Sequence, residues 1–286
     1  MTAFRKAVKA EAKLRLCLIG PSGSGKTLTS LKIAAGLGGP VAVIDSERGS
    51  SEKYADDFDF DVCELESFNP MRYVDALESA AGEYPVVIID SLSHAWSGKD
   101  GALEMVDKSK NKSSFNAWGE VTPVFNTLID TITSYPGHVI ATLRTKMAHS
   151  QERDEKTGKT VVKKIGLQPV FRDGVEYEFD VVADLDLDNV LTVTNTRCPL
   201  LKGAVIPEPD ESIANTLNLW LSGAKIDDLI AEARKEIGTH LGHDVFSDDE
   251  KAQASAWLDD PANRELSKLR KFIGSLEERI RIATAA

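Results

Sequence analysis

One stretch limits the possible folds of this chain more than any other. Residues 20–27 have the sequence Gly-Pro-Ser-Gly-Ser-Gly-Lys-Thr. The apolar run at residues 14–19 predicts a buried strand before this stretch, and residues 28–37 predict a helix after it. Strand, glycine-rich turn and helix with the pattern G-x-x-x-x-G-K-[ST] together indicate a phosphate-binding loop. The alternative is a glycine-rich turn that matches the pattern by chance.

The residue types of this loop predict its chemistry. Glycine has no Cβ, so the backbone can curve around a polyphosphate and direct its N–H groups inward at a helix N-terminus. We expect Lys26 to hold the β- and γ-phosphate oxygens of ATP, and Thr27 to place its hydroxyl on a bridging Mg²⁺ ion. The predicted nucleotide-binding residues are Gly20, Pro21, Ser22, Gly23, Ser24, Gly25, Lys26, Thr27 and Leu28.

Strands and helices alternate after the loop. Buried strands are predicted at residues 41–44, 86–89 and 138–143, and helices at residues 70–81 and 121–132. Such alternation predicts an α/β fold in which helices flank a mostly parallel central sheet. Ligands of such folds bind at the carboxyl ends of the strands.

Three other segments of the core do not follow this alternation. Residues 92–118 have no clean period and carry lysines among serine, asparagine and glycine, which predicts a long surface loop. A short strand is predicted at residues 60–65. Residues 177–187 and 190–194 alternate apolar and polar side chains, which predicts an antiparallel hairpin at the sheet edge.

The last part of the chain is predicted to be helical. A helix at residues 213–221 completes the core, and Ser247 with Glu250 forms a capping box at the start of a later helix. The three helical patterns of the tail cover residues 226–241, 248–258 and 262–282. The predicted domains are a basic N-terminal segment (1–13), an ATPase core (14–222) and a small helical C-terminal region (223–286).

Composition excludes several classes of protein. Apolar residues make up 42% of the chain and charged residues 28%, which is typical of globular proteins. The sequence has neither the long apolar stretch of a membrane span nor a signal peptide, so we expect a cytoplasmic protein, in the host cytoplasm if a phage encodes it. Cys17, Cys63 and Cys198 are scattered, which indicates packing in a reducing compartment. His240 and His243 do not have the spacing typical of a metal site.

The charge of the chain is unevenly distributed. The net charge of −11 argues against nucleic-acid binding by the whole surface. Residues 144–172 nevertheless contain eight basic and three acidic side chains. Within this segment residues 156–159 are predicted to form the tip of a hairpin or a mobile loop. The segment is either a nucleic-acid contact or a charged surface hairpin without function.

Acidic residues at the predicted strand ends are candidates for catalysis. Asp90 follows four buried apolar residues, a Walker B pattern, and is expected to hold Mg²⁺ through water. Hydrolysis also needs a group that deprotonates water. Glu47 is the candidate and Asp45 its rival, because both follow the strand at residues 41–44. We expect this strand to neighbour the one before the phosphate loop, which would bring the carboxylate to the phosphate pocket. Thr142 and Arg144, at the end of a fourth strand, are candidate sensors of the γ-phosphate.

Five segments of the chain resemble the RecA-like ATPase superfamily, and within it the minimal phage-type ATPases associated with single-strand annealing. The resemblance covers roughly residues 14–203. It rests on GPSGSGKT, VAVIDSE, VVIIDS, the ATLRTK strand end and the strand that ends in Thr194-Asn195-Thr196-Arg197. It implies a RecA-like P-loop core, with Glu47 as the catalytic glutamate and Arg197 as a residue that reaches the ATP of the next subunit.

The resemblance also implies partners. RecA-like proteins bind single-stranded DNA with the loops after the third and fourth strands, here residues 92–118 and 144–170. Trp96 and Trp118 in the first loop either stack on bases or pack in the core. The implied partners are single-stranded DNA, further copies of the chain in a ring or filament, and a single-stranded-DNA-binding protein. The candidate DNA contacts are Lys108, Lys110, Lys112, Arg144, Lys146, Lys163 and Lys164.

Two departures from the RecA pattern shape the expected function. Thr142 stands where RecA has a glutamine, and only residues 1–13 precede the core, so we expect annealing or a mediator role rather than strand exchange. The resulting hypothesis is a Mg²⁺-dependent ATPase in phage-type DNA recombination, annealing or repair. The alternatives are a P-loop kinase for a small molecule and a nucleotide-gated assembly protein without significant catalysis.

Overall fold

A computed structural model of the chain describes residues 12–110, 113–153, 160–223, 226–264 and 266–284. The predicted basic segment at residues 1–13 lies almost wholly outside these residues. Contacts between residues divide the chain into two compact units, with the boundary between Leu221 and Ser222. Each unit is described by itself below.

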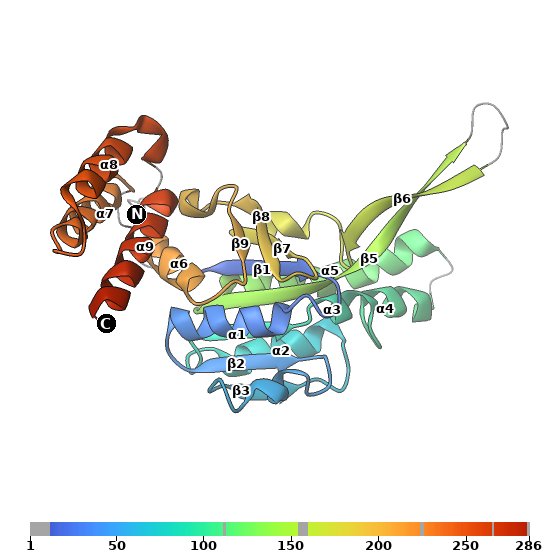
Figure 1. The fold of residues 1–286 in the computed structure, drawn as a ribbon. Coiled ribbons are helices and arrows are strands. Elements are labelled where there is room, and N and C mark those ends of the chain that lie inside the picture. Colours follow the sequence, from blue (N-terminus) through green and yellow to red (C-terminus); the bar gives the residue numbers. More distant parts are fainter. Residues whose placement is uncertain (1–11, 111–112, 154–159, 224–225, 265, 285–286) are drawn as a thin grey trace, which may run out of the picture. The chain divides into compact units, whose positions relative to one another are not determined.

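The first unit is built on a mixed sheet (Figure 1). Its strands follow the spatial order β3-β2-β4-β5-β1-β7-β8-β9, and β6 pairs only with β5. The strands are parallel from β3 to β7, whereas β8 and β9 run antiparallel to their neighbours. Their bounds are β1 Arg15–Gly20, β2 Val41–Asp45, β3 Asp61–Glu64, β4 Val86–Asp90, β5 His138–Arg153, β6 Thr160–Pro169, β7 Val181–Leu185, β8 Val190–Thr196 and β9 Val205–Pro207.

Helices cover both faces of the sheet because the central strands are apolar on both sides. In β1, Leu16 and Leu18 pack with α1 (Lys26–Leu37) and α6 (Ser212–Leu221). Cys17 and Ile19 face the opposite side, with the second set of helices. These are α2 Pro70–Ala80, α3 Ser93–Ser97, α4 Ala102–Lys108 and α5 Ser114–Ser134. The predicted α/β architecture is confirmed, with its mostly parallel sheet, flanking helices, antiparallel hairpin strands and helical C-terminal region.

Strand β5 continues beyond the parallel sheet. Its first half, up to Arg144, pairs with β1, and the second half pairs with β6 in an antiparallel hairpin that projects from the sheet (Figure 1). The register of this hairpin shifts between Ala148 and His149. Residues 145–153 and 160–169 are therefore the two strands of a hairpin. Its predicted tip, residues 156–159, lies outside the described residues.

Three expectations about the core are wrong. Residues 92–118 are not one long loop, because they contain α3, α4 and the start of α5. Helices this short cover too few turns to produce a visible period, and buried Ala95 and Ala102 hold them to the core. The β7–β8 pair is not the outermost element, since β9 adds a further strand. Finally, β2 is not beside β1, because β4 and β5 lie between them.

The C-terminal unit consists mainly of α7 (Ile226–Leu241), α8 (Asp248–Asp259) and α9 (Leu266–Thr284). The predicted capping box of Ser247 and Glu250 is present. The sequence interpretation missed that ligand atoms of Glu236, His240 and Glu277 lie within 4.8 Å of one another. Arg270 donates to Glu236 at 3.1 Å, so one carboxylate of this group already has a cationic partner. None of the helices in the described parts of the chain is both long and apolar enough to cross a membrane.

Candidate nucleotide site

The predicted phosphate loop joins β1 to α1 and has the backbone that its glycines permit. Gly23 and Gly25 have φ values of 84° and 86°, in the left-handed region that other residues rarely adopt. A Cβ on Gly25 would lie 2.3 Å from Nδ2 of Asn189. That amide donates to the Ser24 carbonyl oxygen at 2.9 Å. The turn between β7 and β8 thus supports the loop, and a side chain at residue 25 would displace it.

Lys26 is the second-last residue of the loop and the first of α1, and it is buried. Its Nζ donates to the Pro21 carbonyl oxygen at 2.7 Å, so the side chain lies back across the loop. Burial lowers the pKa of Lys26, while the carboxylates of Asp90 and Glu47 oppose this effect. The site thus holds a cation with little solvent around it, which is a favourable position for binding an anion.

Asp90 ends β4 and lies beside the loop. It is 2% exposed, and its two carboxylate oxygens accept hydrogen bonds of 2.6 Å from the hydroxyls of Thr27 and Thr142. Burial raises the pKa of Asp90, and these two hydrogen bonds offset part of the rise. Thr142, a predicted γ-phosphate sensor, therefore positions Asp90 in this structure. The fold brings both residues of the predicted Mg²⁺ site into direct contact.

The two candidate bases after β2 have different surroundings. Asp45 is 1% exposed, and its carboxylate accepts hydrogen bonds from the Glu47 backbone N–H at 2.5 Å and the Ser51 hydroxyl at 2.8 Å. These bonds close the loop that follows β2. The side chain of Glu47 is 19% exposed and extends toward Arg144 in the middle of β5.

Arg144 links Glu47 to the strand beside the phosphate loop. Its Nε donates to Oε1 of Glu47 at 2.6 Å, and its Nη2 donates to Oε2, so the guanidinium binds both carboxylate oxygens. Arg144 pairs in register with Gly20, the first residue of the loop. Although two strands, β4 and β5, separate β2 from β1, this ion pair brings Glu47 to the same edge of the sheet.

The neighbour of Glu47 connects the site to α3. The Ser46 hydroxyl is hydrogen-bonded to Nδ1 of His94 at 2.7 Å and donates to the Ser91 carbonyl oxygen at 2.9 Å. Burial, followed by the charge of Arg144, lowers the pKa of His94 and so favours a neutral imidazole. The sequence interpretation did not identify His94, because no motif links it to residue 46.

This geometry agrees with a match to a known family. A family model described as an AAA domain matches residues 12–218. The chain belongs to the AAA domain family. Among curated proteins no match was found. A crystal structure of the RadB recombinase is similar to the chain, with 18% sequence identity, coverage of 67% of this chain and 84% of that chain, and a TM-score of 0.41.

Arg197 of this AAA domain protein lies far from its own phosphate loop. It directly follows Thr196 of β8, which pairs with Val181 at the start of β7. Because β7 is parallel to β1, Arg197 lies at the end of the sheet where β1 begins, opposite to the end that carries Gly20. Its guanidinium pairs with Asp180 at 3.2 Å and donates to the Tyr177 carbonyl oxygen at 3.3 Å. The side chain is 65% exposed. Any action of Arg197 on a nucleotide therefore has to take place on another subunit.

The structure separates the candidate DNA contacts into two groups. Lys108 lies on α4 and pairs with Glu104 and Asp100, whereas Lys110 follows the helix and is exposed. Lys146, like Arg144, belongs to β5 and is exposed. Lys112 lies outside the described residues. Lys163 and Lys164 are in β6, but their side chains are outside the described set.

The two tryptophans of the first predicted DNA loop pack against the core. The rings of Trp96 and Trp118 stack with centroids 5.5 Å apart, and Phe125 meets Trp96 edge-on at 5.2 Å. Both indoles are half-buried beside the hydrophobic cluster that covers this face of the sheet. Their packing therefore matches the core interpretation of the sequence.

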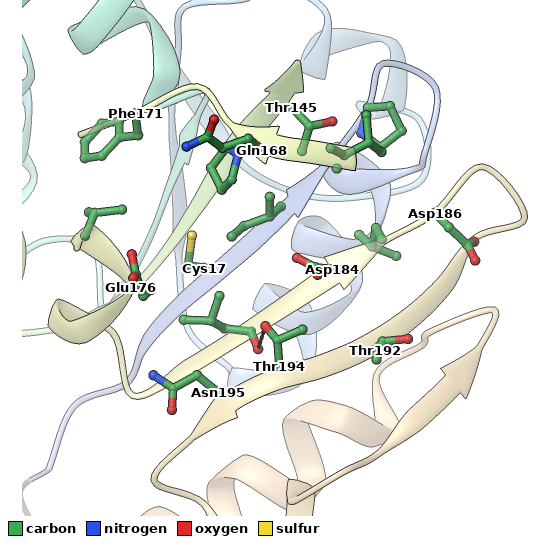
Figure 2. Close-up of a pocket in the computed structure, with 18 of the residues that line it drawn as sticks. Cys17, Thr145, Gln168, Phe171, Glu176, Asp184, Asp186, Thr192, Thr194 and Asn195 are labelled. Atoms are coloured by element: carbon green, nitrogen blue, oxygen red, sulfur yellow. Dashed lines mark hydrogen bonds between the residues drawn. The ribbon is translucent and has the colours of Figure 1, made fainter. Parts of the chain in front are cut away.

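A cavity of about 570 Å³ lies on the face of β1 opposite α1 and borders the start of the phosphate loop (Figure 2). Cys17 lies at its floor, and Asp184, Asp186 and Glu176 contribute carboxylates to its lining. Burial raises the pKa of both Cys17 and Asp184. Lys26, Thr27, Glu47 and Asp90 are not among its lining residues. Because its lining carries four carboxylates and one guanidinium, this cavity is less suited to phosphate groups than the phosphate loop is.

The buried carboxylate of Asp90 makes a stability prediction possible. We expect Asp90→Asn to raise the Tm of the nucleotide-free protein by about 2–4 °C, because removing a poorly compensated buried charge is worth about 1 kcal/mol. Thermal unfolding without Mg²⁺ or nucleotide measures this shift. Since the pKa of Asp90 is raised, acidification neutralises the wild-type carboxyl and removes its cost, so the difference should shrink as the pH falls.

Asp188→Asn is the matched control, because Asp188 is an exposed residue in the β7–β8 turn. It should leave the Tm unchanged within error. A lower Tm for Asp90→Asn would mean that the carboxylate stabilises the nucleotide-free protein, against this prediction.

Proposed function

We propose that this AAA domain protein is a Mg²⁺-dependent ATPase that binds single-stranded DNA and acts as an oligomer in phage-type recombination, annealing or repair. The observation that carries the proposal is the ion pair between Glu47 and Arg144. In this pair the Glu47 carboxylate is bound to Arg144, which lies in register with Gly20 on the strand that continues into the basic hairpin. The strand β5 would thus connect the nucleotide site to the hairpin that contacts DNA.

The residues at the loop suit Mg²⁺-bound ATP. Mg²⁺ prefers oxygen ligands, and the Thr27 hydroxyl with the Asp90 carboxylate offers such donors within 2.6 Å of each other. The raised pKa of Asp90 indicates a buried carboxylate with too little compensating charge, which a cation would supply. Thr27 would hold Mg²⁺ directly and Asp90 through water. When bound, Mg²⁺ neutralises charge on the phosphate oxygens.

Each side chain of the site then has a role in hydrolysis. The backbone N–H groups of residues 20 and 22–28 bind the phosphates, and Lys26 binds the β- and γ-phosphate oxygens. Glu47 accepts a proton from the attacking water, which increases its nucleophilicity. Thr142 keeps the carboxylate of Asp90 in place, and Arg144 senses the γ-phosphate. Arg197 completes the site of a neighbouring subunit, in agreement with its exposed position far from its own loop.

The basic hairpin is the proposed DNA contact. Lys146 is exposed on β5, and β6 carries Lys163 and Lys164 in register with Ser150 and His149. Cations along a projecting hairpin attract the phosphates of an extended strand without reading its sequence. A single-stranded-DNA-binding protein is a further proposed partner, since it occupies the same substrate.

Salt dependence tests the hairpin as a DNA contact. The double variant Lys163→Ala, Lys164→Ala should reduce the slope of log K against log salt by about 1.4, because each lost phosphate contact on a single strand removes about 0.7. Fluorescence anisotropy of a labelled oligothymidylate over a salt series measures this slope.

Lys235→Ala with Lys271→Ala removes two exposed lysines from the C-terminal unit and serves as the charge-matched control. An unchanged slope in the hairpin variant would reject the hairpin as a contact. A reduced slope in the control alone would instead assign DNA binding to the C-terminal helices. Sedimentation of the wild type with ATP and oligothymidylate tests oligomer formation in the same samples.

A further inference from the structure

The cavity beside the phosphate loop has no role in the proposed hydrolysis. Its volume of about 570 Å³ is within the range of small-molecule sites in proteins (Figure 2). Ile19, Phe171 and Val182 form apolar parts of its lining, whereas carboxylates and the hydroxyl and amide groups of β8 form polar parts. A ligand that suits this lining has to combine an apolar body with polar groups.

The charge of this lining is not balanced. Its acidic side chains are those of Asp173, Glu176, Asp184 and Asp186. One basic side chain, that of Arg172, also lines the cavity, and it donates to Asn126 on α5 at 3.1 Å. Within the described ranges of the chain, Asp173, Glu176 and Asp184 form no ion pair. Carboxylates gathered without counter-charge create a negative potential, so the cavity attracts cations.

Two further polar groups of the lining have no hydrogen-bond partner among the described residues. One is the buried hydroxyl of Thr145. The other is the thiol of Cys17, whose side chain is 0% exposed. Burial and the nearby carboxylates of Asp184 and Glu176 raise the pKa of Cys17, so the sulfur stays protonated. Since buried polar groups usually have partners, these two indicate a ligand with N–H donors, from which both can accept.

The spacing of the carboxylates decides which kind of cation fits. A metal ion needs several ligand atoms around one point. In the part of the chain that the structure describes, only Glu236, His240 and Glu277 of the C-terminal unit bring three such atoms within 4.8 Å of one another. The carboxylates of the cavity are therefore too far apart to share one metal ion. They suit a ligand whose positive charges are also separated.

We propose that this cavity binds a linear polyamine, an organic cation in which methylene groups separate ammonium groups. The ammonium groups pair with the carboxylates of Asp184 and Glu176, and the methylene groups lie against Ile19 and Val182. The apolar and the acidic parts of the lining are both used by such a ligand. Because Asp184 is in register with Ile19, the residue before the phosphate loop, the bound polyamine lies beside the nucleotide site.

Polyamine and nucleotide should strengthen each other's binding. The cavity borders Gly20 and Pro21, so the carboxylates of Asp184 and Asp186 place negative charge near the start of the loop. This charge opposes the binding of a triphosphate, and a bound polyamine neutralises it. The coupling is reciprocal, so the nucleotide favours the polyamine to the same extent. The coupling rests on the proposed nucleotide site, whereas polyamine binding itself does not.

Calorimetric titration of the nucleotide-free full chain with spermidine tests the binding. Asp184→Asn and Glu176→Gln should each weaken the affinity by up to about fivefold, the value of a good exposed ion pair. The double variant should lose up to about 25-fold if the two contributions add. Both changes keep the size of the side chain, and burial already disfavours the charged form of Asp184, so the variants should fold.

Asp188→Asn is the matched control, because Asp188 is exposed in the β7–β8 turn and does not line the cavity. It should bind spermidine like the wild type. A wild type without saturable binding, or equal affinities of the wild type and Asp184→Asn, would overturn the inference. A trilysine peptide that binds more tightly than spermidine would also overturn it and assign the cavity to a basic segment of a protein.

Titration with a fluorescent ATP analogue, with and without excess spermidine, tests the coupling. Spermidine should tighten nucleotide binding to the wild type by up to about fivefold and have a smaller effect on Asp184→Asn. Spermidine also binds free nucleotide, but it does so equally in both samples, so the difference between the proteins reports the cavity. Equal effects on the two proteins would overturn the coupling. A wild type that binds spermidine but no ATP would contradict the proposed function and support the polyamine site.

Discussion

Glu47→Gln should reduce ATP turnover by a factor of about 10²–10⁴, the usual contribution of a positioned general base. Glutamine has the size of glutamate but cannot accept the proton of the attacking water. The carboxylate of Glu47 accepts its hydrogen bonds from Arg144, which is not part of the phosphate loop. ATP should therefore bind with nearly unchanged affinity. Phosphate release at saturating ATP and titration with a fluorescent nucleotide measure the two effects separately.

The control for this variant is Glu52→Gln, which makes the same chemical change in the loop that follows β2. Glu52 is exposed, and it should tolerate the change without loss of turnover. Turnover of Glu47→Gln close to the wild-type value would remove Glu47 from the catalytic site. It would then favour a protein in which the nucleotide controls assembly without significant hydrolysis.

Lys26→Ala should lower kcat/KM for ATP by a factor of about 10²–10³, because it deletes a buried cation that faces the transferred phosphate. Lys26 is only 9% exposed, so a phosphate bound there would interact with it through little water. The variant should still fold, since burial already disfavours the charged form of this side chain. Steady-state phosphate release and circular dichroism measure activity and folding.

Lys32→Ala provides the comparison on the same helix. Lys32 lies further along α1, and its Nζ is 3.5 Å from the Pro209 carbonyl oxygen, away from the loop. It should retain wild-type kcat/KM. If Lys26→Ala kept more than about a tenth of the activity, the lysine would not act as the transition-state donor that the loop pattern predicts.

Features that depend on local chemistry were predictable from the sequence. The glycines and Lys26 define the loop because only certain residue types permit its backbone and charge. The strands could be located from apolar runs, and the capping box at Ser247 identified the start of α8. These patterns arise from interactions between residues close in the sequence.

Features that depend on distant contacts were not predictable in the same way. The order of the strands places β5 between β1 and β4, and this order brings Arg144 to Glu47, 97 residues away. The support of the loop by Asn189 joins residues 165 positions apart. No periodicity or motif connects such pairs. The short helices α3 and α4 were missed because tertiary burial, rather than a visible pattern, holds them in place.

The bulge between Ala148 and His149 divides the hairpin into two mechanical sections. The ladder of β5 and β6 is regular from Thr145 to Ala148. It follows directly on the section of β5 that pairs with β1, whose last paired residue is Arg144. A bulge is the place where a strand bends most easily. A force that displaces β5 before the bulge, as at Lys146, is therefore transmitted along the strand to Arg144. A force applied beyond the bulge, as at Lys163, partly bends the hairpin there, so a smaller displacement reaches Arg144.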